Sequence, residues 1–507
     1  MTMDPSLDTN EDASSARGLG SPHWLAVLFA AEVLALTAFN APNERFTRFA
    51  YWDSGSDLTI QALLTRGLRP TIDFGYIYGL LPVLINRLWQ GLFGATPVAC
   101  RGAKLVCNLA LAWGLGRFAV SARVGLAGVA LIAVALPDML LTSTFVLVHS
   151  LEHALLVNAL ALQAGGRRGA ALALVTVCLF VKPSMGYVYG LLLLVAILAH
   201  ERDRWRRAIT PAAATGLVLA CLLSAVYGVR PLLTTVLPGK GLEVYNQSGH
   251  GFFHGAGRAF WLIPGGGLRD YLRYEVGSWI VGSVVLVAGG LLALARIARR
   301  RGTLDDEIVL TCAIMHATFV LFFFGNRWTW PYYYVVLILG LAAMAARGKR
   351  HALLVAMVAA LVLIGSKVKF ETTARLWRSD SSSVETLGLW AAPEERAEWN
   401  KVLELARGQG PVVLLAAVEG AALLTPTVFE PPAGAYFVPG HPMPAEVRRK
   451  AELLANARTI ITARPRGDPG RGGYDRWPEI AAALDGCEVV WEGDLFLVER
   501  RIRPPAR

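Results

Sequence analysis

Long apolar stretches recur between residues 24 and 366 of this chain, and short loops rich in Arg and Lys separate them. Most stretches are near the ~20 residues that a helix needs to cross about 30 Å of hydrocarbon. In lipid, a spanning segment must satisfy its backbone hydrogen bonds internally, which a helix does. The pattern therefore predicts a polytopic α-helical membrane protein.

Composition and charge agree with that prediction. Of 507 residues, 54% are hydrophobic and only 17% charged, with a mean hydropathy of +0.45, unlike a soluble enzyme. The net charge of +11 comes from Arg and Lys in short loops beside apolar segments, which is the pattern of cytoplasmic loops, so we expect no nucleic-acid partner. Five of the six cysteines lie in or beside apolar segments, and no disulfide framework or CxxC metal site is implied.

The apolar segments predict about eleven membrane crossings. Residues 169–200 are too long for one crossing and have basic clusters on both flanks, so the chain must turn back within them. The turn is expected at Lys182 and Pro183, because Pro breaks a helix and Lys needs a partner in lipid. The other spans are predicted at residues 24–40, 98–116, 124–137, 139–164, 208–227, 277–295, 307–325, 332–346 and 351–366.

Loop charge sets the predicted orientation. A cytoplasmic amino terminus puts every basic loop inside, as the positive-inside rule requires, in a multi-pass protein of the plasma (inner) membrane. Residues 1–22 are then a disordered cytoplasmic tail and residues 23–366 the transmembrane domain. The first loop (residues 41–97), the loop at 228–276 and a carboxy-terminal domain (residues 367–507) lie outside.

The carboxy-terminal domain is predicted to be a small α/β unit. Apolar runs at residues 412–416 and 459–462 predict strands, and residues 487–491 and 494–498 predict a hairpin over Glu492 and Gly493. Helices are predicted near residues 394–407, 445–456 and 477–484.

The first outer loop is the longest polar interruption between the early spans. Its residues 49–57 combine Trp, Tyr and Gly with Asp53 and Asp57. The amphipathic run at residues 80–93 predicts a helix lying at the membrane surface. We therefore expect an acidic, aromatic loop held where a lipid headgroup lies, and expect chemistry there.

The predicted topology gathers charged residues at the outer face. Asp53, Asp57 and Asp73 lie in the first loop, Asp138 in a short turn after Pro137, Lys182 at the broken helix and Arg327 in the aromatic run at residues 325–334. A carboxylate there can act as general base on a hydroxyl, and a cation beside it can stabilise a departing phosphate. Such a set suits group transfer from a lipid-linked phosphate.

Three motifs in the first loop resemble those of bacterial GT-C membrane glycosyltransferases of the protein mannosyltransferase and aminoarabinose transferase type. They are Tyr51-Trp52-Asp53-Ser54-Gly55, then Leu63 to Phe74 with its Gly67, Pro70 and Asp73, then Tyr76-Ile77-Tyr78-Gly79-Leu80-Leu81-Pro82. Here Leu80-Leu81-Pro82 replaces the usual Gly-Pro-Leu. Val181-Lys182-Pro183 and the aromatic run at 327–334 also look like features of the group.

The resemblance implies a GT-C fold, a polyprenyl-phosphate-sugar donor, an extracytoplasmic reaction and inversion at the anomeric carbon. Asp53 matches the catalytic acid of the first loop, and Asp138 the second acid between the third and fourth spans. We expect Asp53 to take the acceptor proton, and Lys182 and Arg327 to bind the donor phosphate. The acceptor is an extracytoplasmic glycan, lipid or protein, and membrane lipids surround the enzyme in the cell envelope.

Each of these residues also has a structural explanation. Asp53 is a favoured cap for a helix starting at Ser54, and Asp138 for the fourth span. Lys182 can extend to the interface, and Arg327 can anchor there with its neighbouring tryptophans.

A His-x-x-Glu-His set, His149, Glu152 and His153, lies on the fourth span with both histidines on one face. A divalent metal would need a further ligand that the sequence does not identify, so a polar network lining the cavity is the favoured interpretation and no cofactor is assigned. Other residues expected to line the cavity or bind substrate are Tyr51, Trp52, Asp73, Tyr76, Tyr78, His250, His254 and Arg258.

These observations predict a lipid-phosphate-sugar-dependent membrane glycosyltransferase. A transporter or flippase of lipid-linked or sugar substrates also places charges and a broken helix in the membrane, but its site belongs near the midplane. A polymerase or ligase of oligosaccharides differs only in its donor. A non-catalytic envelope protein with a partner-binding outer domain is the third alternative.

Overall fold

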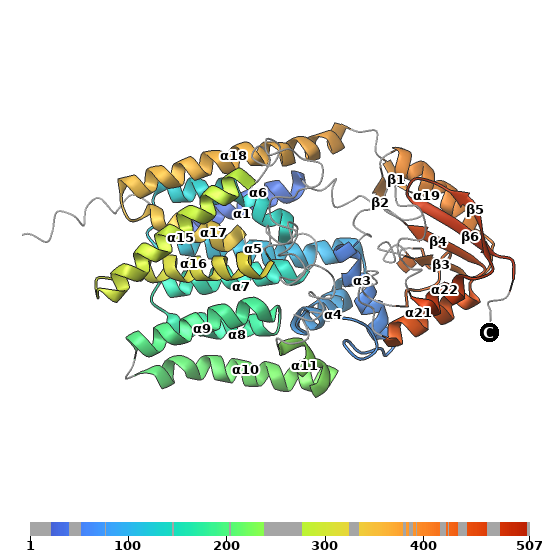
Figure 1. The fold of residues 1–507 in the computed structure, drawn as a ribbon, viewed down its shortest axis with the longest axis horizontal. Helices are drawn as coiled ribbons and strands as arrows, with labels where there is room; N and C mark the ends of the chain where they lie inside the picture. The colour runs from blue at the N-terminus through green and yellow to red at the C-terminus, as the bar shows by residue number, and fades with distance from the viewer. Residues whose placement is uncertain are drawn as a thin grey trace, which may run out of the picture.

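A computed structural model of the chain shows a helical part joined to a small carboxy-terminal domain with a sheet (Figure 1). The structure describes residues 22–39, 52–76, 78–143, 147–201, 204–237, 276–323, 334–378, 382–384, 389–391, 393–415, 422–423, 425–433, 444–463 and 477–503.

Within these residues, a helix occupies each of the eleven positions where a crossing was predicted. They are α1 (Pro22–Phe39), α5 (Pro97–Ser121), α6 (Leu126–Ser143), α7 (Leu147–Ala164), α8 (Arg168–Leu179), α9 (Pro183–His200), α10 (Trp205–Tyr227), α15 (Val276–Ala298), α16 (Leu304–Phe323), α17 (Tyr334–Ala345) and α18 (Lys349–Arg378).

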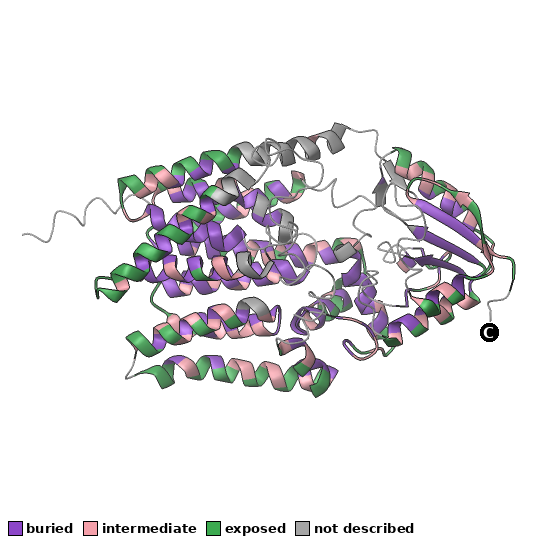
Figure 2. Cartoon of the chain, viewed as in Figure 1, coloured by how far each residue is buried: buried purple, intermediate pink, exposed green. Residues whose placement is uncertain are grey.

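Three stretches of the described helices are long and apolar enough to cross a membrane by length and composition, namely Pro97–Ser121, Trp205–Tyr227 and Val281–Ala298. Exposed apolar side chains cover the outward faces of α10 and α15, for example Leu217, Val218 and Leu291 (Figure 2). Such faces are those of an integral membrane protein. Eleven crossings, and the side of the membrane on which each loop lies, stay predictions.

The predicted turn at Pro137 and Asp138 is wrong. Helix α6 continues through both residues to Ser143, and α7 begins only at Leu147. A proline inside a helix removes one hydrogen bond, but neighbouring helices can hold the helix together. Leu136 and Met139 on either side of this pair are fully buried in the core. Asp138 therefore does not cap the fourth span.

The broken segment at residues 169–200 is confirmed. Helix α8 ends at Leu179, the amides of Val181 and Lys182 both donate to Cys178 O, and α9 begins at Pro183. Lys182 has an extended backbone (φ −149°, ψ 96°), as a residue before proline prefers. Helix α18 extends beyond the last predicted span, to Arg378.

Basic loops gather at one end of the helical part. Arg168 at the start of α8 pairs with Glu307 of α16 (2.6 Å) and with Glu201 after α9 (3.5 Å). Arg347, after α17, pairs with Asp306 of α16 at 2.7 Å. The α8–α9 turn and the first-loop helices lie at the opposite end, beside the carboxy-terminal domain (Figure 1). The loops around Arg168 and Arg347, which were predicted to share one side of the membrane, thus share one end of the helical part.

The first outer segment is more helical than predicted. Helix α3 (Trp52–Thr65) occupies the stretch expected to be a loop, and its residues 55–61 are buried without a break, polar and apolar side chains alike. Helix α4 (Leu81–Phe93) confirms the predicted amphipathic helix and exposes Leu88, Leu92 and Phe93. A further short helix, α11 (Val229–Val236), follows α10.

The carboxy-terminal domain has the predicted helices and strands. Helices α19 (Pro393–Ala406), α21 (Pro444–Asn456) and α22 (Pro478–Leu484) accompany a four-stranded sheet in the order β3-β4-β6-β5. In it β3 (Val412–Leu415) is parallel to β4 (Thr459–Ala463), while β6 (Phe496–Arg501) is antiparallel to both β4 and β5 (Cys487–Glu492). A hairpin of β1 (Ser382–Val384) and β2 (Leu389–Ala391), not predicted, pairs separately.

Two apolar cores stabilise the domain, one on each side of the sheet. Trp399 of α19 packs edge-on against Phe496 of β6, with ring centroids 4.5 Å apart, and Ile461 lies in the same cluster. Leu454 and Ile480 belong to the other cluster, which α21 and α22 cover. The second core thus holds α21 against the sheet, on the side of the domain nearest the first-loop helices (Figure 2).

Candidate active site

The third first-loop motif is docked on the α8–α9 turn. Gly79 N donates to Val181 O at 2.9 Å, and Leu81 N donates to Phe180 O at 3.0 Å. A Cβ on Gly79 would lie 2.0 Å from Phe180 O, closer than any real contact, so only glycine allows this approach. Two motifs about 100 residues apart therefore form one structure, which ends at Lys182.

A buried ionic cluster lies at this junction. Lys182 Nζ is 3.3 Å from Glu152 Oε2, and His149 Nδ1 is 3.7 Å from the same oxygen. The three side chains are at most 8% exposed, and His153, one turn along α7, is fully buried. Charges held this far from water need compensation, which the pair supplies. The intramembrane His and Glu residues singled out by sequence are thus brought together with Lys182.

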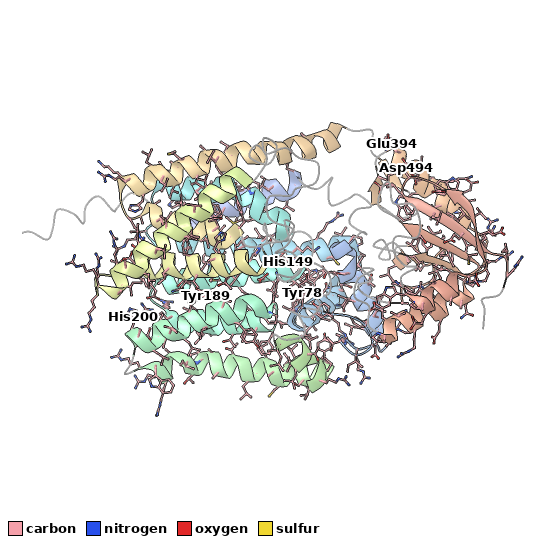
Figure 3. The ribbon with its side chains drawn as sticks, in the orientation of Figure 1. Tyr78, His149, Tyr189, His200, Glu394 and Asp494 are labelled. Carbon is pink, nitrogen blue, oxygen red and sulfur yellow. The ribbon has the colours of Figure 1, made fainter. Side chains whose placement is uncertain are left out.

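Aromatic side chains from the first loop cover this cluster. The Tyr78 ring meets the His149 ring edge-on at 5.7 Å, and Tyr76 meets Tyr78 at 5.9 Å. Figure 3 shows Tyr78 and His149 side by side, whereas Tyr189 and His200 lie toward the other end of the helices. Burial, and then the nearby Asp57 carboxylate, raise the pKa of Tyr76 well above its ordinary value. Its phenol is therefore neutral and can donate a hydrogen bond.

A second ion pair adjoins the cluster. Asp57 Oδ2 lies 3.7 Å from Lys104 Nζ and accepts a hydrogen bond from Leu147 N, the first residue of α7, at 3.2 Å. Asn86 and Gln90 of α4 donate to the Asp57 carbonyl oxygen, which ties α3 to α4. Both Asp57 and Lys104 are buried.

Sequence reasoning missed Lys104. It is buried in α5, one of the helices long and apolar enough to cross a membrane, and a lone lysine there was the signal that marks a functional candidate. Lys104 pairs with Asp57, as Lys182 pairs with Glu152. The site therefore holds two buried lysine–carboxylate pairs at the end of the bundle nearest the first loop.

The charged side chains of the cluster indicate which kind of ligand the site can bind. Two lysines face two carboxylates across α3, α5, α7 and the α8–α9 turn, and the Tyr78 ring lies against His149 beside them. An ammonium is a point charge with three donors and binds phosphate oxygens well. A phosphate entering beside Lys182 would share the charge that Glu152 now balances, in a site of low polarity where such interactions are strong.

The Asp73 side chain stabilises the turn in which it lies. Its Oδ2 accepts from Arg69 N at 2.8 Å and from Arg69 Nε at 3.3 Å, and Thr71 in that turn adopts a positive φ of 62°. Of the expected acids, Asp53 lies in the first turn of α3 and Asp138 within α6, but their side chains are outside the described residues. The same applies to the Trp52 side chain and to Tyr51, Arg327, His250, His254 and Arg258.

In the described part of the chain, no three His, Cys, Asp or Glu side chains are grouped so that they could hold a metal ion. His149 and Glu152 are joined to Lys182 through the Glu152 carboxylate.

No protein-family model matches the chain, and no curated protein matches it. A similar solved structure is that of ArnT from Cupriavidus metallidurans, described as bound to undecaprenyl phosphate. The sequence identity is 16%, 95% of this chain and 99% of that chain are covered, and the TM-score is 0.46. A likeness of this degree assigns no role to any residue.

Proposed function

We propose that the protein is an inverting membrane glycosyltransferase of the GT-C type, which moves a sugar from a polyprenyl-phosphate donor to an extracytoplasmic glycan, lipid or protein. The observation that carries the proposal is the buried cluster of Lys182, Glu152 and His149 beside Tyr78. A lysine held in the membrane part, at the end nearest the first loop, suits the phosphate of a lipid at a bilayer surface.

In the proposed reaction, an acceptor hydroxyl oxygen attacks C1 of the sugar from the face opposite the phosphate. The C1–O bond to the acceptor forms as the C1–O bond to phosphate breaks, and its electron pair leaves with the phosphate. Asp53 takes the hydroxyl proton as general base, with Asp138 as a second acid in support. Lys182 and Arg327 stabilise the charge on the leaving phosphate, and Lys104 adds to the positive potential.

The position of the cluster supports an enzyme over a transporter. His149 lies in the first turn of α7, and Gln163 in its last turn contacts Glu307 among the ion pairs of the opposite end. Fourteen residues separate the two, or about 21 Å along a helix. A transporter site is expected between two gates near the midplane, whereas this cluster is at one end.

Purified protein incubated with short-chain polyprenyl-phosphate sugars and cell-envelope extract tests the proposal. We expect wild type to transfer sugar and Asp53→Asn to lose about 10²–10⁴-fold in rate, the usual contribution of a general base. Lys182→Met should lower the rate as well, through loss of phosphate stabilisation. Asp494→Asn, the same change at an exposed residue of the outer domain, is the matched control and should transfer normally.

Equal rates for wild type and Asp53→Asn would contradict the catalytic role of this residue. Absence of transfer with every donor, together with uptake of lipid-linked sugar into vesicles, would favour the transporter instead.

A further inference from the structure

Two side chains of helix α21, in the carboxy-terminal domain, form hydrogen bonds with the backbone of the first loop. Glu446 Oε2 accepts a hydrogen bond from Gly75 N at 3.0 Å, and the Arg449 guanidinium donates to Asp73 O. Glu446 is fully buried, so this contact is part of a closed interface rather than a surface encounter. About 370 residues of chain separate the partners.

Two further contacts join the same bodies. Arg66, just after α3, donates to Pro432 O at 2.9 Å. Leu423 packs against Leu58 and Cys100, which belong to α3 and α5. The outer domain thus contacts α3, the residues just after α3 and the turn at residues 73–75, where α21 supplies two charged side chains to the interface.

Asp73 and Gly75, which accept and donate these hydrogen bonds, are only a few positions from the candidate site. Gly75 is held by Glu446, and four residues later Gly79 is held by Val181 O. Between these two anchors lie Tyr78, whose ring meets that of His149, and Tyr76, whose ring meets that of Tyr78. A segment this short, fixed at both ends, has little freedom left, so each anchor sets where the tyrosines lie.

We propose that Glu446 and Arg449 are positioning residues of the active site, through which the outer domain holds Tyr76 and Tyr78 over the Lys182–Glu152 pair. The inference rests on the proposed function only for the consequence in catalysis. The hydrogen bonds of Glu446 and Arg449 with the first loop do not depend on which reaction the protein catalyses. Misplacement of substrate-positioning groups by an ångström lowers turnover strongly, so the coupling lets the domain control the rate.

The test uses the full-length purified protein with Glu446→Ala, Arg449→Ala and the conservative Glu446→Gln, which keeps an oxygen to accept from Gly75. Glu398→Ala is the matched control, because Glu398 also accepts from two backbone amides, Asp494 N and Leu495 N, but inside the domain. Hydrogen exchange of residues 73–81, and of strands β4 and β6 as a check of domain folding, is measured for each variant.

We expect both Ala variants to exchange residues 73–81 about tenfold faster while β4 and β6 stay protected, because one hydrogen bond to a charged group is lost in each. Glu446→Gln should restore protection, and Glu398→Ala should loosen only residues 493–496. In the transfer assay the Ala variants should lose about tenfold in kcat with little change in KM for the donor.

Unchanged exchange of residues 73–81 in both Ala variants would contradict the claim that Glu446 and Arg449 restrain the first loop. Faster exchange with undiminished transfer would overturn their role in positioning the site. Should wild type transfer no sugar, the proposed function fails, and the exchange of residues 76–81 alone then decides whether the outer domain holds the two tyrosines.

Discussion

At position 79, the absence of a methyl group lets the first loop reach the turn that carries Lys182. Gly79→Ala would place Cβ 2.0 Å from Phe180 O, a backbone atom that cannot move aside cheaply. We expect a loss of about 3 kcal/mol in the free energy of unfolding, at the upper end for overpacking, and loss of sugar transfer. Thermal unfolding in detergent and the transfer assay measure both.

Gly91→Ala is the control for that change. Gly91 lies in α4, and nothing is within 4 Å of the point where a Cβ would lie. Alanine there should stabilise the helix by about 0.5–1 kcal/mol and leave transfer unchanged. Equal stability of the two variants would contradict the tight approach at Gly79.

At the scale of elements, α8 and α16 are joined at the end of the bundle remote from the site. Arg168 donates to Glu307 from Nε (3.0 Å) and from a terminal nitrogen (2.6 Å), and Gln163 donates to the same carboxylate at 3.0 Å. Glu307→Gln removes the nearer of the two carboxylates that pair with the partly buried Arg168 guanidinium and leaves only Glu201, at 3.5 Å. We expect a loss of about 3 kcal/mol in stability with kcat unchanged, measured by unfolding and by transfer kinetics.

The exposed pair Lys401–Glu404 of α19 provides the comparison. Its partners are 41% and 68% exposed, so Lys401→Ala should change stability by less than about 1 kcal/mol. A marked fall in kcat for Glu307→Gln would show instead that the two ends of the bundle are coupled during the reaction.

At the scale of the whole molecule, charge is sorted between two ends. The loops with Arg168, Arg347 and their partners lie at one end, and Lys182, the first loop and the outer domain lie at the other. The positive-inside rule then predicts that the outer domain lies outside the cytoplasm. A reporter enzyme that works only outside should be active when fused after Arg507, and one fused in the loop after Ala298 should not. The reverse pattern would invert the topology.

The sequence by itself determined which segments become helices and where one of them breaks. Apolar length, basic flanks and Pro183 are local signals, and α8, α9 and most of the outer domain follow them. Local signals failed where packing decided. Pro137 lies inside a helix because neighbouring helices hold it, and α3 forms in a polar stretch whose residues 55–61 are all buried in the fold.

Only the tertiary structure decided which polar residues share a site. Glu152 and His149 could be named from sequence because charges in an apolar span are rare, but their pairing with Lys182, and that of Asp57 with Lys104, depends on how four helices meet. The hydrogen bond between Glu446 of α21 and Gly75 joins residues about 370 positions apart. A single sequence carries no signal for such contacts, because the burial and hydrogen bonding that select them exist only once the chain has folded.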